Sequence, residues 1–262
     1  MLCALVAGRC RACRSECKKL SGVLLAMVPL TTMPPITIAQ ADLARFGSTW
    51  LHNGHRLSRT PPESSSELGE LFDNAVGHAL AAMLGDIPVV TPNRNALMPA
   101  QANCVEVGPV RIIGGVRPQN FDVGYRPDGV RFVFDSKTLN DADSIKKNWQ
   151  NMVNDLATEA TTVHSRFPHA LVTFMVIVPK PCLMPAQQVA LIQTLERLAR
   201  RIVVDEPVYL AEAIALVAWN PDNGTIDTDI PDPDSPLRIE KFPNHTEAAY
   251  MSRYKGLPPH TE

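Results

Sequence analysis

The spacing of apolar residues along the chain predicts two long amphipathic helices. In the first, apolar side chains recur every three or four positions over residues 68–84, and Gly85 closes the helix. Ser64 followed by Glu67 has the pattern of a capping box, so we expect this helix to begin at Ser64. The second helix extends over about six turns, because its apolar stripe continues through residues 145–163.

Runs of β-branched and other apolar residues predict the strands of a central sheet. Residues 104–113 form one run, interrupted by a Gly-Pro pair, which indicates either one strand or a bulged pair. Residues 170–178 are almost all apolar, as in a strand covered on both faces. Residues 187–201 predict a helix and residues 213–219 another strand. This alternation predicts an α/β domain with a central mixed β-sheet flanked by helices.

A hairpin is predicted between the two long helices. Residues 119–126 and 130–137 are strand-like runs on either side of a Pro-Asp-Gly turn at residues 127–129. If Asp and Gly form a two-residue turn, Asp122 lies directly opposite Asp135 on the neighbouring strand. A shift of one residue in the register would separate these two acids, so the turn decides the chemistry.

The second strand of this hairpin adds an amine to the two acids. Side chains alternate along a strand, so Asp135 and Lys137 share one face. Carboxylates on adjacent strands suit Mg²⁺, which prefers oxygen ligands and typically takes one or two carboxylates plus substrate phosphate oxygens. Such an ion neutralises a phosphodiester, and Lys137 could orient the attacking water or stabilise developing charge. The predicted reaction is hydrolysis of a nucleic-acid backbone.

The order of elements and the spacing of these residues are similar to a known family. Asp122, a gap of twelve residues and then Asp135-Ser136-Lys137 resemble the core of the PD-(D/E)XK nucleases, especially type II restriction endonucleases. The resemblance covers roughly residues 64–178. It implies a restriction-endonuclease-like fold, with Asp122, Asp135 and the backbone carbonyl of Ser136 as metal ligands and Lys137 as the catalytic lysine. Phe121 stands where the family name has proline, a frequent departure.

Members of this family often add an acid from the first helix. Asp73 matches that place best, because it lies at the edge of the apolar stripe. Glu70 is the second choice, since it projects from the opposite, polar side of the helix. The alternative interpretation of Asp135 and Lys137 is an ordinary solvated strand face, whose ion pair contributes little to stability.

The start of the second long helix offers a candidate surface for DNA. Lysines and amides gather there, and they can contact phosphates or read base edges: Lys146, Lys147, Gln150 and Asn151. A solvated polar face is the alternative. The resemblance implies a homodimer that cleaves double-stranded DNA at a specific sequence, because one site cuts one strand and a two-fold protein matches a palindromic target. A repair or phage nuclease acting on structured DNA, and a non-catalytic DNA-binding protein, are the alternatives.

Composition restricts these interpretations. The 262 residues have 45% hydrophobic and 20% charged residues, which excludes collagen-like and mostly disordered chains. The formal net charge of −2 does not suit a protein that coats nucleic acid indiscriminately, so contact with DNA requires a local basic surface or metal ions. No Gly-x-Ser-x-Gly elbow and no phosphate loop occur, which argues against an esterase and an ATP-driven motor. No stretch is apolar for the length that a membrane span needs.

The two ends of the chain differ from its middle. We interpret residues 1–40 as a leader that is disordered or has a mis-annotated start, with Met33 as the true start, and a signal peptide is the alternative. Residues 41–220 are interpreted as the nuclease domain, and residues 221–262 as an irregular segment packed on the domain or trailing from it. Most cysteines lie in the leader, which leaves a main body suited to the reducing cytoplasm. The cluster of Cys10, Cys13 and Cys17 lacks a downstream pair that would complete a zinc site.

Histidines provide weaker candidates. His52 and His55 superficially suggest an HNH-type nuclease, but the surrounding pattern does not fit, so we interpret them as part of a polar loop. His164 and His169 flank a proline and could bind a metal together, although loop histidines are ordinarily solvated.

Overall fold

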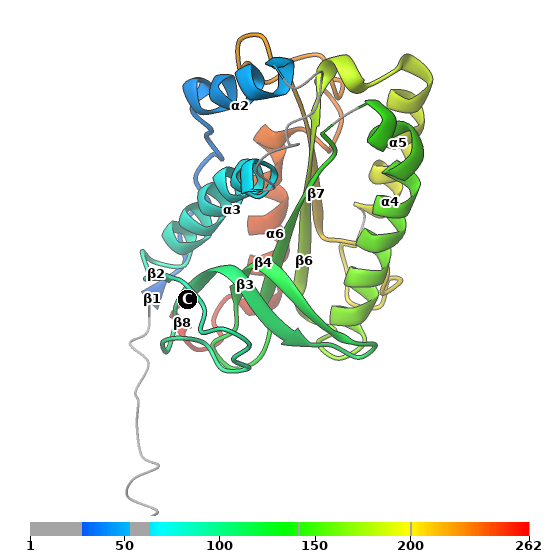
Figure 1. The fold of residues 1–262 in the computed structure, drawn as a ribbon. Helices are drawn as coiled ribbons and strands as arrows, with labels where there is room; N and C mark the ends of the chain where they lie inside the picture. The colour runs from blue at the N-terminus through cyan, green and yellow to red at the C-terminus, as the bar shows by residue number, and fades with distance from the viewer. Residues whose placement is uncertain (1–27, 53–62, 141, 200, 262) are drawn as a thin grey trace, which may run out of the picture.

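The computed structural model describes residues 28–52, 63–140, 142–199 and 201–261. A mixed six-stranded sheet occupies the centre of this described part, with helices on both faces (Figure 1). Across the sheet the strands follow the order β2 (Val89–Val90), β3 (Val105–Ile113), β4 (Pro118–Tyr125), β5 (Phe132–Thr138), β6 (Leu171–Pro179) and β7 (Ala213–Trp219). Strands β3, β4 and β5 pair antiparallel, whereas β5, β6 and β7 pair parallel. The predicted α/β class with a mixed sheet flanked by helices is therefore confirmed.

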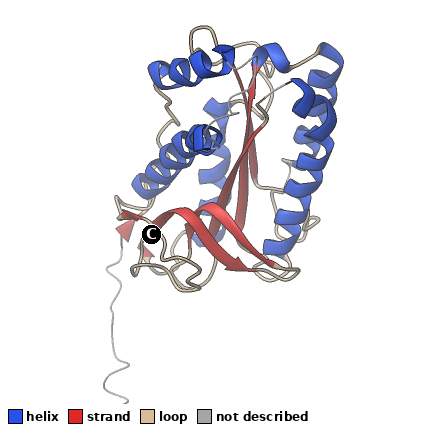
Figure 2. Cartoon of the chain, viewed as in Figure 1, coloured by secondary structure: helices blue, strands red, loops and turns tan. Residues whose placement is uncertain are grey.

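The helices form two layers around the sheet. Helices α3 (Glu63–Met83) and α6 (Phe242–Tyr254) cover one face, and α4 (Ala142–His164) and α5 (Pro185–Leu198) cover the other (Figure 1). Helix α2 (Gln40–His52) contacts α3. Two 3-10 turns, η1 (Lys180–Cys182) and η2 (Ile239–Lys241), and a short parallel pair, β1 (Val28–Pro29) with β8 (His260–Thr261), complete the elements (Figure 2). None of the described helices is both long and apolar enough to cross a bilayer.

The predicted bounds of strands and helices agree best with the observed ones in the elements whose side chains are most buried. Every residue of β6 and of β7 is buried, as expected for strands covered by helices on both faces. Strand β3 is a single strand with a register shift between Val107 and Val110, at the Gly-Pro pair that interrupts its apolar run. Helix α4 extends one turn or less beyond the predicted stripe at each end.

The start of α3 differs from the prediction. The helix begins at Glu63, so Ser64 lies inside it rather than at the N-cap, and the capping-box prediction is wrong. The C-terminal end agrees, because Gly85 adopts a positive φ of 90° directly after the last turn.

The hairpin has the predicted register but a different turn. Val123 pairs with Phe134 and Tyr125 with Phe132, a register that brings Asp122 level with Asp135. The predicted two-residue turn is wrong, because the ladder stops at Tyr125 and residues 126–131 form a wider connection. Buried charge explains the difference. Arg126 leaves the ladder to bind Glu106, with Nε 2.6 Å from Oε2, and Arg131 binds Asp128 within the connection.

Both ends of the described chain contain ordered, buried residues where the sequence predicts a leader and an irregular segment. Within the supposed leader, Met33 is buried and its N–H donates to the Glu247 carboxylate at 2.9 Å. The segment after residue 220 was expected to be irregular, yet it contains α6, whose Phe242 and Tyr250 are buried against the body. Few apolar residues mark this helix, so its period was hidden in the sequence. The cysteine cluster of the leader lies outside the described residues.

Candidate active site

Four acids line one cavity of about 360 Å³, and three of them, besides Glu70, come from three different elements. Helix α3 contributes Asp73, β4 contributes Asp122 and β5 contributes Asp135. Asp73 and Asp135 are only 6% and 7% exposed. A solvated strand face does not bury carboxylates in this way, so the structure contradicts that alternative for Asp135. The remaining lining residues are Ser66, Gly69, Glu70, Gly108, Pro109, Ser136 and Thr138.

The acids converge because β4 and β5 separate at this point. Their backbone pairing reaches Val123 and Phe134 but does not continue to the next pair. The Ser136 N–H donates instead to Oδ2 of Asp122 at 2.9 Å, and the Ser136 hydroxyl donates to the same atom at 3.3 Å. The Asp122 side chain therefore takes the place of a strand carbonyl. The place where the two strands separate, at residues 122 and 135–137, together with Asp73 of α3, which lines the same cavity, is called the fork below.

Glycines allow the surrounding elements to approach the fork. A Cβ on Gly69 of α3 would lie 3.0 Å from the Ser136 hydroxyl oxygen, so the helix packs closely on β5. Asp73 follows one turn later on the same helix and reaches the cavity. On the other side, Gly108 has a φ of 123° at the bulge of β3, and bulges commonly re-aim a strand beside a functional site.

Lys137 is held between two carboxylates. Its Nζ donates to Asp135 Oδ2 and, at 2.9 Å, to Glu159 Oε1 of α4. Glu159 is buried, and its second oxygen, Oε2, has no hydrogen-bond partner among the described residues. The sequence analysis missed Glu159. Its signal was an acid three residues after Leu156 on the apolar stripe of α4, a place where a charge is buried and needs a partner.

The acids at the fork retain protons more readily than isolated carboxyl groups. Burial and then the neighbouring Asp135 raise the pKa of Asp122 to about 8, while the Ser136 N–H and Lys137 oppose the shift. Burial and the charge of Asp122 raise the pKa of Asp73 to about 8. Burial also raises the pKa of Asp135, to about 6, against the opposing effect of Asp122 and Lys137. The cavity thus gathers several carboxyl groups, whereas Lys137, which binds Asp135, lies outside its lining.

The pKa of Lys137 is also raised, but by neighbouring carboxylates and not by burial. Burial alone would lower its pKa, but the charges of Asp135 and Glu159 outweigh burial and raise the pKa above its usual range. The side chain is therefore an ammonium ion at neutral pH, suited to stabilising negative charge rather than to removing a proton.

The other predicted residues are placed as follows. Glu70 and Asp73 of α3 both line the cavity, so their position does not decide which of the two acids joins the site. Lys146, Gln150 and Asn151 are exposed on α4, while the side chain of Lys147 lies outside the described residues. Within the described ranges no three His, Cys, Asp or Glu side chains already form a compact metal-binding group. The three acids share a cavity without being drawn together as ligands.

The predictions for the histidines have different outcomes. Residues 53–62, which include His55, lie outside the described residues. His169 is exposed, as expected of a loop histidine. The prediction of solvation is wrong for His164, which is buried in the last turn of α4 with its Nδ1 2.9 Å from the Val208 carbonyl oxygen.

Comparisons of the chain with models of protein families, with curated proteins and with solved structures gave no match. The chemistry of the fork must therefore be argued from its own residues.

Proposed function

We propose that this chain is a Mg²⁺-dependent endonuclease that hydrolyses DNA phosphodiester bonds at a specific sequence, as type II restriction enzymes do. The observation that carries the proposal is the convergence of Asp73, Asp122 and Asp135 on one cavity, with Lys137 beside Asp135. The register of the hairpin, the burial of the acids and the closeness of α3 all serve this arrangement. Together they favour a cation-dependent site over incidental surface charge.

The residues at the fork fit a hard divalent cation. Asp73 Oδ1 is buried and has no hydrogen-bond partner among the described residues, so an oxygen is left for a ligand. Burial, followed by the neighbouring acids, raises the pKa values of Asp73 and Asp122, and a bound cation would oppose both effects by favouring the carboxylate forms. Asp122, Asp135 and the carbonyl of Ser136 would hold Mg²⁺, with Asp73 in support. When bound, the ion would neutralise the phosphodiester and lower the barrier to attack by water.

The chain's own groups have distinct tasks in this proposal. Asp122, which accepts the Ser136 N–H, would also supply an oxygen to the cation. Lys137, kept cationic by Asp135 and Glu159, orients the attacking water and stabilises negative charge that develops on the phosphate. Glu159 does not line the cavity and acts as a positioning residue through Lys137.

DNA contact and assembly extend the proposal beyond the fork. The exposed Lys146, Gln150 and Asn151 lie on α4, the helix that also positions Lys137 through Glu159. They would contact double-stranded DNA, with Lys146 at phosphates and the amides at base edges. A homodimer would provide two such sites for the two strands of a palindromic target.

Plasmid cleavage by the full chain tests the function. We expect discrete fragments with Mg²⁺ and none with EDTA. Lys137→Ala should reduce cleavage at least about a thousandfold, because it removes a preorganised charge beside the phosphate. Lys255→Ala, which changes an exposed lysine after α6, is the matched control and should cleave normally. Retained cleavage by Lys137→Ala would refute the role of Lys137.

Other outcomes distinguish the alternatives. Nicking that depends on DNA structure rather than sequence would indicate a repair or phage nuclease. Binding of DNA without cleavage by the native chain, across Mg²⁺ and Mn²⁺, would indicate a non-catalytic DNA-binding protein.

A further inference from the structure

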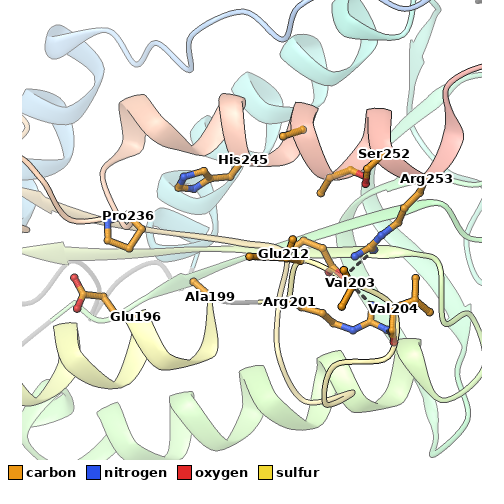
Figure 3. A pocket seen from close by; sticks show the side chains of 13 residues that line it. Glu196, Ala199, Arg201, Val203, Val204, Glu212, Pro236, His245, Ser252 and Arg253 are labelled. Carbon is orange, nitrogen blue, oxygen red and sulfur yellow. Dashed lines mark hydrogen bonds and ion pairs between the residues drawn. The ribbon is translucent and has the colours of Figure 1, made fainter.

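A second and larger cavity, of about 620 Å³, shares no lining residue with the cavity of the fork. Figure 3 shows the side chains that line it. It is lined by residues at the end of α5, in the segment that follows α5, directly before β7 and in helix α6, and it is open to solvent on one side. Its volume is in the range of small-molecule sites. Most of its wall is made of small and aliphatic side chains: Ala199, Ile202, Val203, Val204, Pro236, Ala248 and Ala249.

A buried ion network closes one end of this cavity. Arg201 Nη1 and Arg253 Nη1 donate to the same oxygen, Oε1 of Glu212, at 2.7 Å and 2.8 Å (Figure 3). The other oxygen of Glu212 accepts the Val172 N–H at 2.7 Å. The side chains of Arg201 and Arg253 are 0% and 4% exposed. Two guanidinium groups thus share one carboxylate at the cavity wall.

Arg253 has an unused binding edge. Within the described residues, Nη1 makes the hydrogen bonds of this guanidinium, to Glu212 and to the carbonyls of Ala170, at 2.9 Å, and His169. Its Nε and Nη2 are buried without a hydrogen-bond partner among the described residues, and so is Nε of Arg201. The Nε and Nη2 donors of one arginine point in the same direction and match the two oxygens of a carboxylate. Buried donors of this kind are costly unless a ligand binds them.

The charges of the cavity restrict where an anion can lie. Glu196, the other acid of the wall, lies at the opposite end from Arg253 (Figure 3) and accepts the Ser235 hydroxyl at 2.7 Å. An anion would be repelled at that end and attracted at the arginine end. The apolar wall between the two ends suits a hydrocarbon body.

We propose that this cavity binds a small carboxylic acid with an apolar body. The carboxylate occupies the Nε and Nη2 edge of Arg253, and the apolar body lies against Val203, Ala248 and Ala249. A carboxylate fits better than a phosphate, because its two oxygens match the two parallel donors of this edge one to one. The proposal stands independently of DNA cleavage, since none of these residues lines the fork.

Titration of the full chain with hexanoate, followed by the ¹⁵N signals of the arginine side chains, tests the site. We expect the Nε–H signal of Arg253 to shift on saturation. Hexanoate should bind at least about tenfold more tightly than hexan-1-ol, which lacks the charge, and than acetate, which lacks the body. Equal binding of the alcohol would overturn the role of Arg253. Tighter binding of hexyl phosphate than of hexanoate would overturn the assignment of a carboxylate.

Three variants separate the two parts of the site. Arg253→Lys keeps a positive charge near Glu212 but removes the two-donor edge, and it should weaken hexanoate binding at least about tenfold. Ala249→Phe fills the apolar part without altering the ion network and should weaken binding to a similar extent. Asn244→Phe, at an exposed position of α6 that does not line the cavity, is the matched control and should change binding less than about twofold. If Arg253→Lys does not fold, unchanged binding by Ala249→Phe still refutes the proposal.

Discussion

The fork and the Arg201–Glu212–Arg253 network bury charge with opposite signs. At the fork, Asp73, Asp122 and Asp135 outnumber Lys137, and burial raises the pKa of each acid. In the network, burial would also raise the pKa of Glu212, but His164 and Arg253 outweigh it and the pKa is lowered.

This difference indicates what each region is built to receive. Each leaves buried polar atoms without partners among the described residues, an acceptor on Asp73 and donors on Arg253. Buried polar groups are almost always satisfied in a complete assembly. The unpaired acceptor therefore favours a cation at the fork, and the unpaired donors favour an anion in the second cavity.

Breaking the network should have the largest effect on stability. Glu212→Gln leaves Arg201 and Arg253 buried without their shared counter-ion, so we expect the free energy of unfolding to fall by about 3–5 kcal/mol. Urea unfolding measures this change. Glu240→Gln, which removes an exposed partner of Arg238, is the control and should cost less than about 1 kcal/mol. Equal losses in the two variants would contradict the view that the network is a closed structural unit.

The fork should make stability depend on pH in a defined direction. The pKa values of Asp73 and Asp122 are about 8 in the folded state, above the usual value of a carboxyl group, so the stability they contribute is lost as pH rises through 8. Between pH 7 and pH 9, in EDTA, the free energy of unfolding should fall by roughly 1–3 kcal/mol. His245 and His260, whose pKa values burial lowers, are neutral in this window and add nothing.

Two results would count against this assignment. The first is a free energy of unfolding that rises between pH 7 and pH 9. The second is a fall that Mg²⁺ does not reverse, because a bound cation should replace the lost protons as counter-charge at the fork.

Removing one acid from the fork sharpens the contrast with the network. Asp73→Asn should raise the free energy of unfolding by about 1–2 kcal/mol at pH 8 without metal, since it deletes a buried negative charge. The same substitution should weaken stabilisation by Mg²⁺. Asp155→Asn, at an exposed position of α4, should change neither quantity. Destabilisation of the Asp73 variant at pH 8 would show that its carboxylate has a structural partner instead.

The smallest expected effect is on DNA affinity. Lys146→Ala should weaken DNA binding less than about tenfold and reduce the salt dependence by about one phosphate contact, because exposed lysines act through charge alone. Titration of labelled duplex at several salt concentrations measures both. Unchanged affinity and slope would place the DNA surface elsewhere.

The sequence predicted the parts of the fold that local pattern controls. The period of apolar residues indicated α3 and α4, and unbroken apolar runs indicated β6 and β7. The predicted hairpin register, which brings Asp122 level with Asp135, is also observed, although the two-residue turn from which it was predicted is not. Helix α6 was not predicted, because its few buried aromatic residues form no clear stripe. The turn at residues 126–131 is wider than predicted, because Arg126 and Arg131 bind their partners there.

By itself the sequence determined the α/β order of elements and the pairing of two acids with a lysine, because strand alternation and helical period are local properties of the chain. Only the tertiary structure decided that Glu159 from α4 holds Lys137, and that Arg201 and Arg253, far apart in sequence, share Glu212. Those contacts depend on where distant segments pack and on the low local dielectric, which strengthens the attraction between buried charges. No short pattern of residues encodes the packing or the dielectric.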